Sequence, residues 1–245
     1  MCGEDMPRFF VDEINKDNIT LDGENARHIG RSLRMKPGEP LTVCCKGIDY
    51  DCTVSSITGE QVFLELVSCH SCEAEPDIKV TLFQAVPKGD KLEQIVKKAV
   101  ELGVSQVVPV LTRRCVSRPD EKDFAKKLQR LNKIAEEAAK QSGRGIIPEV
   151  LPIISYKTAL DMLPDFQRSV ILYEAEGGCS FSQVDFSGAE NIALIVGSEG
   201  GFELDEAQAA AECGAERVWL GKRILRCETA PITALSLLMF LTNNL

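Results

Sequence analysis

The sequence contains neither a long apolar run nor a secretory signal. No apolar stretch in its 245 residues approaches the roughly 20 residues that a membrane-spanning helix needs. The first residues, MCGEDMPRFF, lack the basic and then apolar pattern of a signal peptide. We therefore expect a cytoplasmic protein without a membrane partner, long enough for one large domain or two modest ones.

An overall basic charge is also missing. The net charge of −9 argues against a wholly basic nucleic-acid-binding protein. The charge is uneven, however, because residues 79–144 hold 15 Lys and Arg against 8 Asp and Glu. This basic middle third could hold phosphate groups. Solvated lysine faces on two amphipathic helices would also explain the excess.

The ten cysteines are scattered along the chain, which favours reduced packing residues over a disulfide framework in a cytosolic protein. Cys69 and Cys72 have the spacing of half a metal site. A structural zinc site normally needs two such halves, and the sequence offers no convincing second half. We therefore predict no metal.

Two patterns divide the chain. Residues 1–72 contain short strand-like segments separated by turn signals, with one helical piece at 24–35, which is typical of a small β-barrel. Residues 73–77 are a polar linker. Over residues 78–245 strands alternate with helices, which predicts an α/β domain with a mainly parallel sheet. Its predicted strands are 78–86, 104–112, 169–176, 191–199 and 216–221, and its helices 89–103, 120–142 and 228–243.

Three loops follow strands of this domain, and ligands of such sheets bind beyond the carboxyl ends of the strands. The loops are residues 173–176, 197–202 and 220–228. The middle loop, in VGSEGGF, matches neither common phosphate-binding pattern, and Glu199 would repel a phosphate. Its glycines either let a ligand with little negative charge approach the backbone or simply make a tight strand-to-helix turn. This loop alone leaves both interpretations open.

The third loop contains two apolar residues, Ile224 and Leu225, between Arg223 and Arg226. A loop of this kind is normally exposed, so apolar side chains in it call for an explanation. Wrapping an adenine ring would be one reason, and packing under a neighbouring loop would be another. Glu228 and Thr229 then stand where either could cap the last helix.

Segments along nearly the whole chain resemble the RsmE family of SPOUT-class methyltransferases, which methylate N3 of a uridine in small-subunit (16S) ribosomal RNA. They are MPRFFV, HIGRSLRMKPGE, VPKGDKLEQIVKKAVELGVSQVVPVLTRRCVSR, KIAEEAAKQSGRGIIPEV, VGSEGGF and LGKRILRCETA, of which the last two together are highly specific. The sequence has Ser198 where the family usually has Pro, and Cys227 where it usually has Thr.

The resemblance implies a homodimer with a trefoil-knotted domain, an N-terminal PUA-like RNA-binding barrel and S-adenosylmethionine as the methyl donor. A knot departs from the usual rule that chains are unknotted. The donor pocket that the resemblance implies consists of Leu172, Tyr173, Glu174, Val196, Gly197, Gly200, Gly201, Leu220, Gly221, Ile224, Leu225, Arg226 and Thr229. Because the donor carries no phosphate, a nearby carboxylate is tolerable.

Methylation of uracil N3 requires that this nitrogen first lose its proton. The enzyme must favour the resulting anion with a base or with cations near the flanking carbonyl oxygens. We hypothesise that Arg226 or Arg144 stabilises the anion and that Glu199 or Glu228 is the base. A helix-start or interface salt bridge is the alternative role for Arg226. The target base must also leave its stack to reach the pocket.

The expected RNA contacts are Arg8, His28, Arg31 and Arg34 on the barrel, and Lys88, Lys91, Arg113, Arg114, Arg118, Gln141 and Arg144 beyond it. Taken alone, each of these residues is more often a solvated surface group, and the resemblance supports an RNA contact for Lys88, Arg114, Gln141 and Arg144. Arg31 and Arg34 are expected on one helix face. A packed position inside the barrel is the alternative for His28, and Trp219, in an apolar strand, is expected in the core.

Two other functions stay open at the level of sequence. One is a non-catalytic RNA-binding protein of the same fold, in which Ser198 and Cys227 would have cost the activity. The other is a nucleotide-dependent enzyme acting on a small molecule, against which the missing phosphate motifs and the N-terminal barrel count. The sequence leaves open whether the substrate is naked RNA or an assembled ribosomal subunit.

Overall fold

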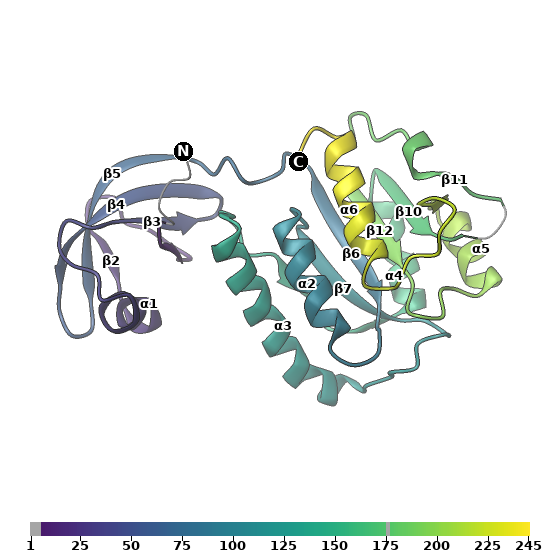
Figure 1. Cartoon of the computed structure of the whole chain (residues 1–245), viewed down its shortest axis with the longest axis horizontal. Coiled ribbons are helices and arrows are strands. Elements are labelled where there is room, and N and C mark those ends of the chain that lie inside the picture. The colour runs from purple at the N-terminus through teal and green to yellow at the C-terminus, as the bar shows by residue number, and fades with distance from the viewer. Residues whose placement is uncertain (1–5, 175–176) are drawn as a thin grey trace. The chain divides into compact units, whose positions relative to one another are not determined.

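The computed structural model describes residues 6–174 and 177–245 (Figure 1). The described chain forms two compact units. Unit 1 contains the residues up to Glu75 together with Ala139–Ile147, and unit 2 contains Pro76–Ala138 and Pro148–Leu245. The first division lies inside the predicted linker. The inclusion of 139–147 in unit 1 was not predicted, because these residues end and follow the long helix of the α/β region in the sequence.

Unit 1 is built on a five-stranded sheet with the order β1-β3-β4-β5-β2. The strands are β1 (Arg8–Phe10), β2 (Ile19–Leu21), β3 (Pro40–Cys45), β4 (Ile48–Ile57) and β5 (Val62–Ser71). β1 runs parallel to β3, and the other neighbours are antiparallel. Among the described residues β1 and β2 are not paired with each other. The predicted barrel is therefore a curled, PUA-like sheet that is open between these two strands.

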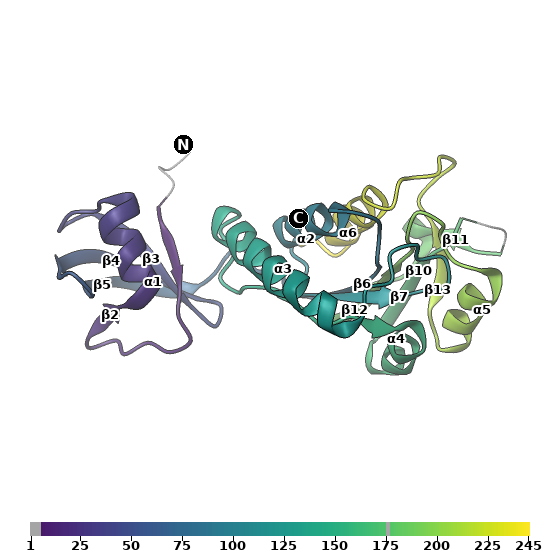
Figure 2. The same cartoon turned by 90° about the horizontal axis from the view of Figure 1, so that it is seen from below.

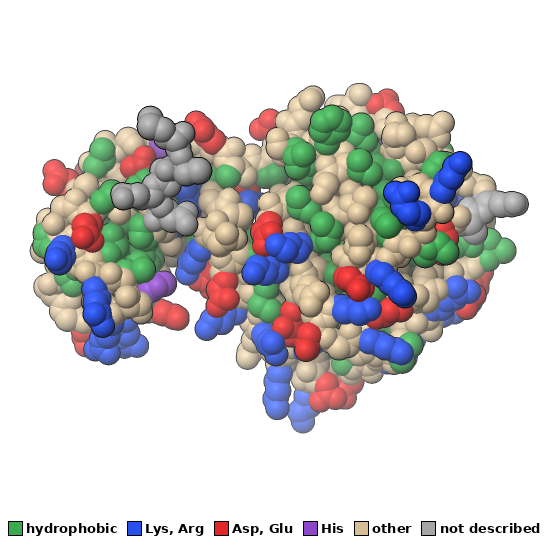
Figure 3. Space-filling view, in the orientation of Figure 1, with side chains coloured by type: hydrophobic (Ala, Val, Ile, Leu, Met, Phe, Trp, Pro, Cys, Tyr) green, Lys and Arg blue, Asp and Glu red, His purple; other side chains and the backbone are tan. Residues whose placement is uncertain are grey.

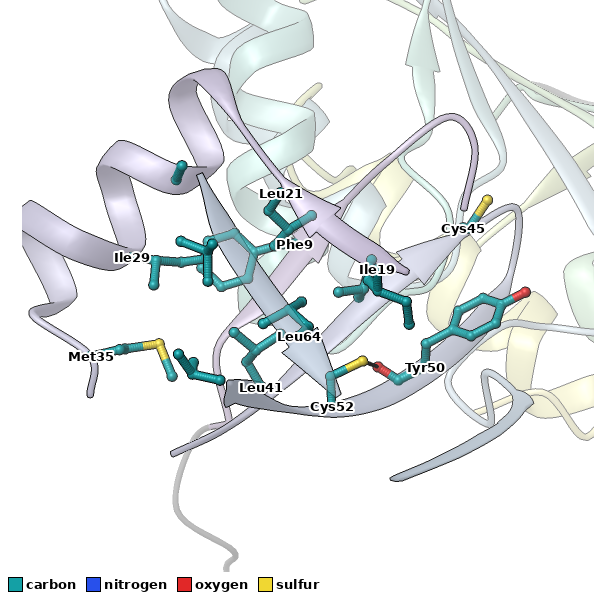
Figure 4. Close-up of a cluster of buried hydrophobic side chains, with 14 residues drawn as sticks. Phe9, Ile19, Leu21, Ile29, Met35, Leu41, Cys45, Tyr50, Cys52 and Leu64 are labelled. Carbon is teal, nitrogen blue, oxygen red and sulfur yellow. Dashed lines mark hydrogen bonds between the residues drawn. The ribbon is translucent and has the colours of Figure 1, made fainter. Parts of the chain in front are cut away.

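A single apolar cluster fills this sheet (Figure 4). The short helix α1 (Gly23–Arg27) and the π-helical η1 (His28–Leu33) contribute Ala26 and Ile29, which are buried against Phe9.

Several cysteines lie in or next to this core, and all cysteines in the described part of the chain are free thiols. The predicted packing role fits Cys44, Cys45 and Cys52, which are buried, whereas Cys69 is exposed. Cys2 lies outside the described residues.

Residues 139–147 are tied to unit 1 by the carboxylate of Glu75. Arg144 donates from Nε and Nη2 to the two carboxylate oxygens at 2.9 and 2.8 Å. The backbone N–H groups of Gly145 and Ile146 donate to the same carboxylate at 2.8 and 3.0 Å. A methyl group at Gly145 would lie 2.5 Å from Cβ of Cys72, so only glycine allows this close approach. Glu75 and Arg144 are far apart in the sequence, so no local sequence pattern predicts that they form a pair.

Unit 2 contains an eight-stranded sheet in which every described pairing is parallel. The order is β11-β13-β10-β12-β6-β7-β8, and β9 also pairs with β7. The strands are β6 (Lys79–Ala85), β7 (Gln106–Leu111), β8 (Glu149–Val150), β9 (Ile154–Ser155), β10 (Arg168–Leu172), β11 (Cys179–Ser180), β12 (Asn191–Val196) and β13 (Glu216–Trp219). The central strands β6 and β12 are buried at every position after the first, because helices cover both faces of the sheet. This confirms the predicted α/β domain.

The helices of unit 2 lie on opposite sides of the sheet (Figure 2). α2 (Lys91–Glu101) packs against α6 (Ala230–Leu241), whereas α4 (Tyr156–Met162) and α5 (Leu204–Glu212) bury Ala159, Ala207 and Ala210 against the central strands. The remaining helical elements are α3 (Glu121–Gln141), η2 (Leu163–Asp165) and η3 (Phe181–Gln183). α4 was not predicted, because its seven residues give too short a window for the helical period.

The chain crosses the sheet edge between β13 and α6. β13 lies beside β10, on the side away from β12, whereas α6 packs against α2, which follows β6. The connection from Leu220 to Thr229 therefore passes the carboxyl ends of β10 and β12, and the predicted trefoil knot requires such a crossing. Within residues 6–174 and 177–245, no helix combines the length and apolar character that a membrane crossing needs.

Candidate active site

The three predicted loops meet because their strands are neighbours in the sheet. β10 lies between β13 and β12, and all three are parallel, so their carboxyl ends share one edge. Beyond that edge lies a cavity of about 550 Å³. Its walls are Leu172, Tyr173, Glu174, Val196–Gly201, Val218–Gly221, Arg223–Cys227 and Ala230. The volume lies within the usual range for small-molecule sites, roughly 300–1,000 Å³.

The glycines of the middle loop are needed by the turn itself. A methyl group at Gly197 would lie 2.9 Å from Cα of Gly201, and one at Gly200 would lie 2.9 Å from Cβ of Arg114. Gly201 has a φ of +66°, a conformation that side chains disfavour. The turn nevertheless forms one wall of the cavity. The glycines therefore make a tight strand-to-helix turn and also leave its backbone open to a ligand, so the two interpretations of this loop are compatible.

The middle loop is also held by neighbouring strands and loops. Gln84, fully buried in β6, donates from Nε2 to the carbonyl of Gly197 at 3.1 Å. Ser198 is buried, and its hydroxyl donates to the carbonyl of Arg114 at 3.3 Å. Arg114 donates to the carbonyl of Gly200 at 2.7 Å and to both carboxylate oxygens of Glu203 at 2.9 Å. The serine at position 198 thus fits the loop with its hydroxyl bonded.

The third loop presents apolar surface to the cavity. Ile224 is 84 % exposed and lines the cavity together with the half-buried Leu225, so Ile224 is not packed under a neighbouring loop. Trp219 corrects a prediction, because it lines the cavity and is 37 % exposed rather than buried in the core. In β13 only Val218 is fully buried, so the last residue of this short strand points away from the core.

Two arginines line the cavity with their side chains exposed, Arg223 and Arg226. Neither forms an ion pair within the described residues. The carbonyl of Arg226 accepts the backbone N–H groups of Thr229 and Ala230, at 2.8 and 2.9 Å, which fixes the chain entering α6. A guanidinium held beside a cavity can stabilise negative charge that develops there.

The two carboxylates proposed as bases share one lysine. The ammonium of Lys91 lies 3.1 Å from Oε1 of Glu199 and 3.2 Å from Oε2 of Glu228. Burial tends to raise the pKa of Glu199, but hydrogen bonds from its own backbone and from Lys91 outweigh burial and lower it. Hydrogen bonding from Cys227, its own backbone and Lys91 lowers the pKa of Glu228. Both groups are therefore ionised at neutral pH and are weakened as proton acceptors.

Cys227 is buried in the same network. Its thiol donates to Oε2 of Glu228 at 3.1 Å and lies 3.7 Å from the ammonium of Lys91. Burial, with the hydrogen bond to Glu228, raises the pKa of this thiol to about 12. The thiol thus stays protonated and supplies the hydrogen bond that a threonine hydroxyl would supply.

Several predicted RNA contacts are ion-paired within the protein. Arg144 is 3 % exposed and is paired with Glu75 in unit 1, so the predicted catalytic and RNA-contacting roles do not fit its environment. Arg8 donates to both carboxylate oxygens of the buried Asp49 at 2.6 Å. Arg113 pairs with Asp205, Arg114 with Glu203 and Lys91 with Glu199 and Glu228. On the face drawn in Figure 3, basic and acidic side chains are intermixed, which agrees with this pairing.

The other predicted RNA contacts have exposed side chains. They are His28, Arg31, Arg34, Lys88, Arg118 and Gln141. The ring of His28 meets that of Phe9 edge to face at 5.9 Å, so the histidine is anchored but not enclosed. Arg31 and Arg34 do not share a helix, because η1 ends at Leu33 and Arg34 follows in a left-handed conformation. Arg118 donates to the carbonyls of Thr112 and Arg113 and shapes its own loop.

The predicted donor pocket and the cavity coincide except at a few positions. Thr229 does not line the cavity; it precedes α6 without a side-chain cap. Ala175 and Glu176, in the first loop, lie outside the described residues. The prediction missed Ser198, Glu199, Val218, Trp219, Arg223, Cys227 and Ala230 as cavity walls. All of them are within two residues of predicted positions, so closeness in the sequence to the predicted pocket was the available signal.

Comparison with known proteins relates both units to RNA methyltransferases. The RNA methyltransferase domain family matches residues 74–239, and the RNA methyltransferase PUA domain family matches residues 21–67. The chain is 35 % identical to the ribosomal RNA small subunit methyltransferase E of Bacillus subtilis, over 98 % of each chain. It is 30 % identical to the protein of that name from Aquifex aeolicus, over 94 % of this chain and 98 % of the relative.

Two similar crystal structures contain the methyl donor. The ribosomal RNA small subunit methyltransferase E of Neisseria gonorrhoeae, bound to S-adenosyl methionine, is 34 % identical with a TM-score of 0.86, over 96 % of this chain and 98 % of that chain. A putative methyltransferase of Legionella pneumophila, in complex with the same cofactor, is 30 % identical with a TM-score of 0.81, over 96 % and 97 %.

Proposed function

Because the chain belongs to the ribosomal RNA small subunit methyltransferase E (RsmE) family, we propose that it methylates N3 of a uridine in small-subunit ribosomal RNA with S-adenosylmethionine as the donor. One observation carries the proposal. The cavity of about 550 Å³ at the carboxyl ends of β13, β10 and β12 is lined by 12 of the 13 residues of the pocket that the family resemblance implies. Its relatives with bound donor support the same ligand.

The chemistry of the walls fits this donor. Ile224 and Leu225 offer apolar surface suited to an adenine ring. The glycine turn exposes backbone at the opposite wall, and Glu174 and Glu199 supply carboxylates but no phosphate cradle. A sulfonium compound is compatible with these carboxylates, whereas a polyphosphate would be repelled. This argument weighs against the nucleotide-dependent alternative.

The protein must lower the energy of the uracil anion. When bound, S-adenosylmethionine supplies an electrophilic methyl group. Hydrogen bonds from its own backbone and from Lys91 weaken Glu199 as a base, and hydrogen bonds from Cys227, its own backbone and Lys91 weaken Glu228. We therefore assign the larger share of the catalysis to stabilisation of the anion's charge rather than to strong proton abstraction. Arg226 is our candidate for this role, because its exposed side chain borders the cavity and could lie beside a uracil carbonyl oxygen. The N3 proton then leaves to solvent or to one of the carboxylates.

We propose further that the protein works as a cytoplasmic homodimer. α6 is apolar around its whole circumference, and Leu237, Phe240 and Leu241 are 38, 67 and 41 % exposed on one side. Such a helix is normally covered on all sides, and a second copy of the chain would cover this surface. Exposed basic residues, including Arg31 and Lys88, are the proposed RNA contacts. The substrate is either free ribosomal RNA or the assembled subunit.

The first experiment is calorimetric titration of S-adenosylmethionine into the purified protein, with ATP as the control ligand. We expect micromolar binding of the donor at one site per chain and none of ATP. Transfer of labelled methyl to small-subunit ribosomal RNA, followed by mapping of the modified base, tests the reaction. Donor binding without methyl transfer to either form of the RNA would favour the non-catalytic alternative.

A further inference from the structure

Lys91 occupies an unfavourable position for a lysine. It is the first residue of α2, where the positive end of the helix dipole disfavours a cation. Its side chain is nevertheless held close to the protein, with 33 % exposure. Carboxylates must therefore offset the unfavourable placement, and two of them come from outside the helix.

Those carboxylates come from two segments that border the cavity. Glu199 lies in the glycine turn after β12 and lines the cavity itself. Glu228 lies in the segment that enters α6, next to Cys227, which lines the cavity. The ammonium of Lys91 contacts both, at 3.1 and 3.2 Å. The backbone N–H of Lys88 donates to Glu199 at 3.1 Å, so the segment before α2 holds the same carboxylate. Lys91 itself does not line the cavity.

The lysine also removes a repulsion. Without it, Glu199 and Glu228 would face each other as two ionised groups and would push the turn and the α6 segment apart. The thiol of Cys227 extends the network by donating to Glu228 at 3.1 Å, and Cys227 does line the cavity. The distance between the glycine turn and the segment that enters α6 thus depends on Lys91, whose side chain lies outside the cavity.

We propose that Lys91 is a positioning residue that joins the glycine turn to the Cys227–Glu228 segment and thereby shapes the donor pocket. The inference rests on the proposed function, since it names what holds the pocket in the proposed methyltransferase. It replaces the RNA contact that the sequence predicted for Lys91. One ammonium between two carboxylates leaves a local charge of −1, which repels a phosphate.

The test compares Lys91→Met with Lys98→Met. Both changes remove a lysine of α2 and its ion pairing, but Lys98 pairs only locally with Glu101 and its side chain is 54 % exposed. We expect Lys91→Met to weaken calorimetric donor binding, measured without RNA, by about tenfold or more, because the charge-assisted bonds to two pocket segments are lost. Lys98→Met should bind the donor like the unmodified protein. Lys91→Arg should restore much of the affinity.

Kinetics separate positioning from RNA contact. A positioning role raises KM for the donor and leaves the salt dependence of RNA binding unchanged. If Lys91→Met instead binds the donor normally and loses RNA affinity with a smaller salt slope, Lys91 is an RNA ligand and the inference is overturned. If the unmodified protein itself fails to bind the donor, the proposed function is what fails.

A double-mutant cycle covers the case in which Lys91→Met folds poorly. Glu228→Gln keeps the size of the side chain and removes one of the two charges that Lys91 contacts. With the milder Lys91→Gln, the effects of the two changes on donor affinity should be less than multiplicative, since they remove the same interaction. Independent, multiplicative effects would overturn the inference.

Discussion

At the scale of single residues, the cations in and around the cavity are of two kinds. Arg114 and Lys91 are paired with carboxylates and hold loops, whereas Arg226 lines the cavity without an ion-pair partner among the described residues. We expect Arg226→Ala to lower the single-turnover rate of methyl transfer by about 10²- to 10³-fold, as for loss of one charge-stabilising donor. Donor affinity measured by calorimetry should change little. Full-rate transfer by this variant would remove Arg226 from the mechanism.

The glycine turn gives a second prediction at this scale. Gly197→Ala would place a methyl group 2.9 Å from Cα of Gly201, so the backbone of the turn must move. We expect at least a tenfold loss of donor affinity, measured by calorimetry. Gly59→Ala is the matched control, because nothing lies within 4 Å of its added methyl group. Equal donor affinity of the two variants would mean that the turn does not shape the pocket.

At the scale of elements, the carboxylate of Glu75 gathers several bonds from the segment 139–147. Glu75→Ala removes an ion-pair partner of the buried Arg144 and the acceptor of two backbone N–H groups. We expect the free energy of unfolding to fall by about 3–5 kcal/mol, the usual cost of removing one member of a buried ion pair. Urea denaturation measures this change. Glu73→Ala, at an exposed neighbouring position, should leave stability nearly unchanged.

The network that joins α2, the glycine turn and α6 gives a prediction about pH. The pKa values of Glu199 and Glu228 are lowered from 4.5, so their contribution is complete above pH 4.5 and is lost as the pH falls further through the lowered values. The pKa of Lys91 is raised from 10.5 by hydrogen bonds to Glu199 and Glu228, so the lysine stays charged up to pH 10.5. The difference in Tm between the protein and Lys91→Met should be constant from about pH 5 to 10 and vanish in acid. A difference that disappears near pH 7 would contradict this network.

At the scale of the whole molecule, the exposed side of α6 predicts self-association. Phe240→Asp should raise the Kd of the proposed dimer by about tenfold or more, because it places a charge in a surface that the second copy would cover. Light scattering coupled to gel filtration measures the change. Val67→Asp is the control, since Val67 is also 67 % exposed and lies in unit 1. A monomeric unmodified protein would remove the dimer from the proposal.

The sequence by itself determined the class of fold and which loops border the cavity. Apolar strands alternating with amphipathic helices predict a parallel sheet from local periodicity alone. The rule that ligands bind beyond the carboxyl ends of such strands then selects the loops after β10, β12 and β13. The parallel sheet and the meeting of these loops at one cavity could be predicted because the strand and helix patterns depend on neighbours in the sequence.

Only the tertiary structure decided what each charged residue does. Arg144 and Arg226 are both arginines in motifs that resemble the family, yet one is buried against Glu75 and the other borders the cavity. Lys91 meets Glu199 and Glu228, which lie more than 100 residues away in the sequence. Ion pairs of this kind are set by the path of the chain, and neither composition nor periodicity records which carboxylate a given cation will meet.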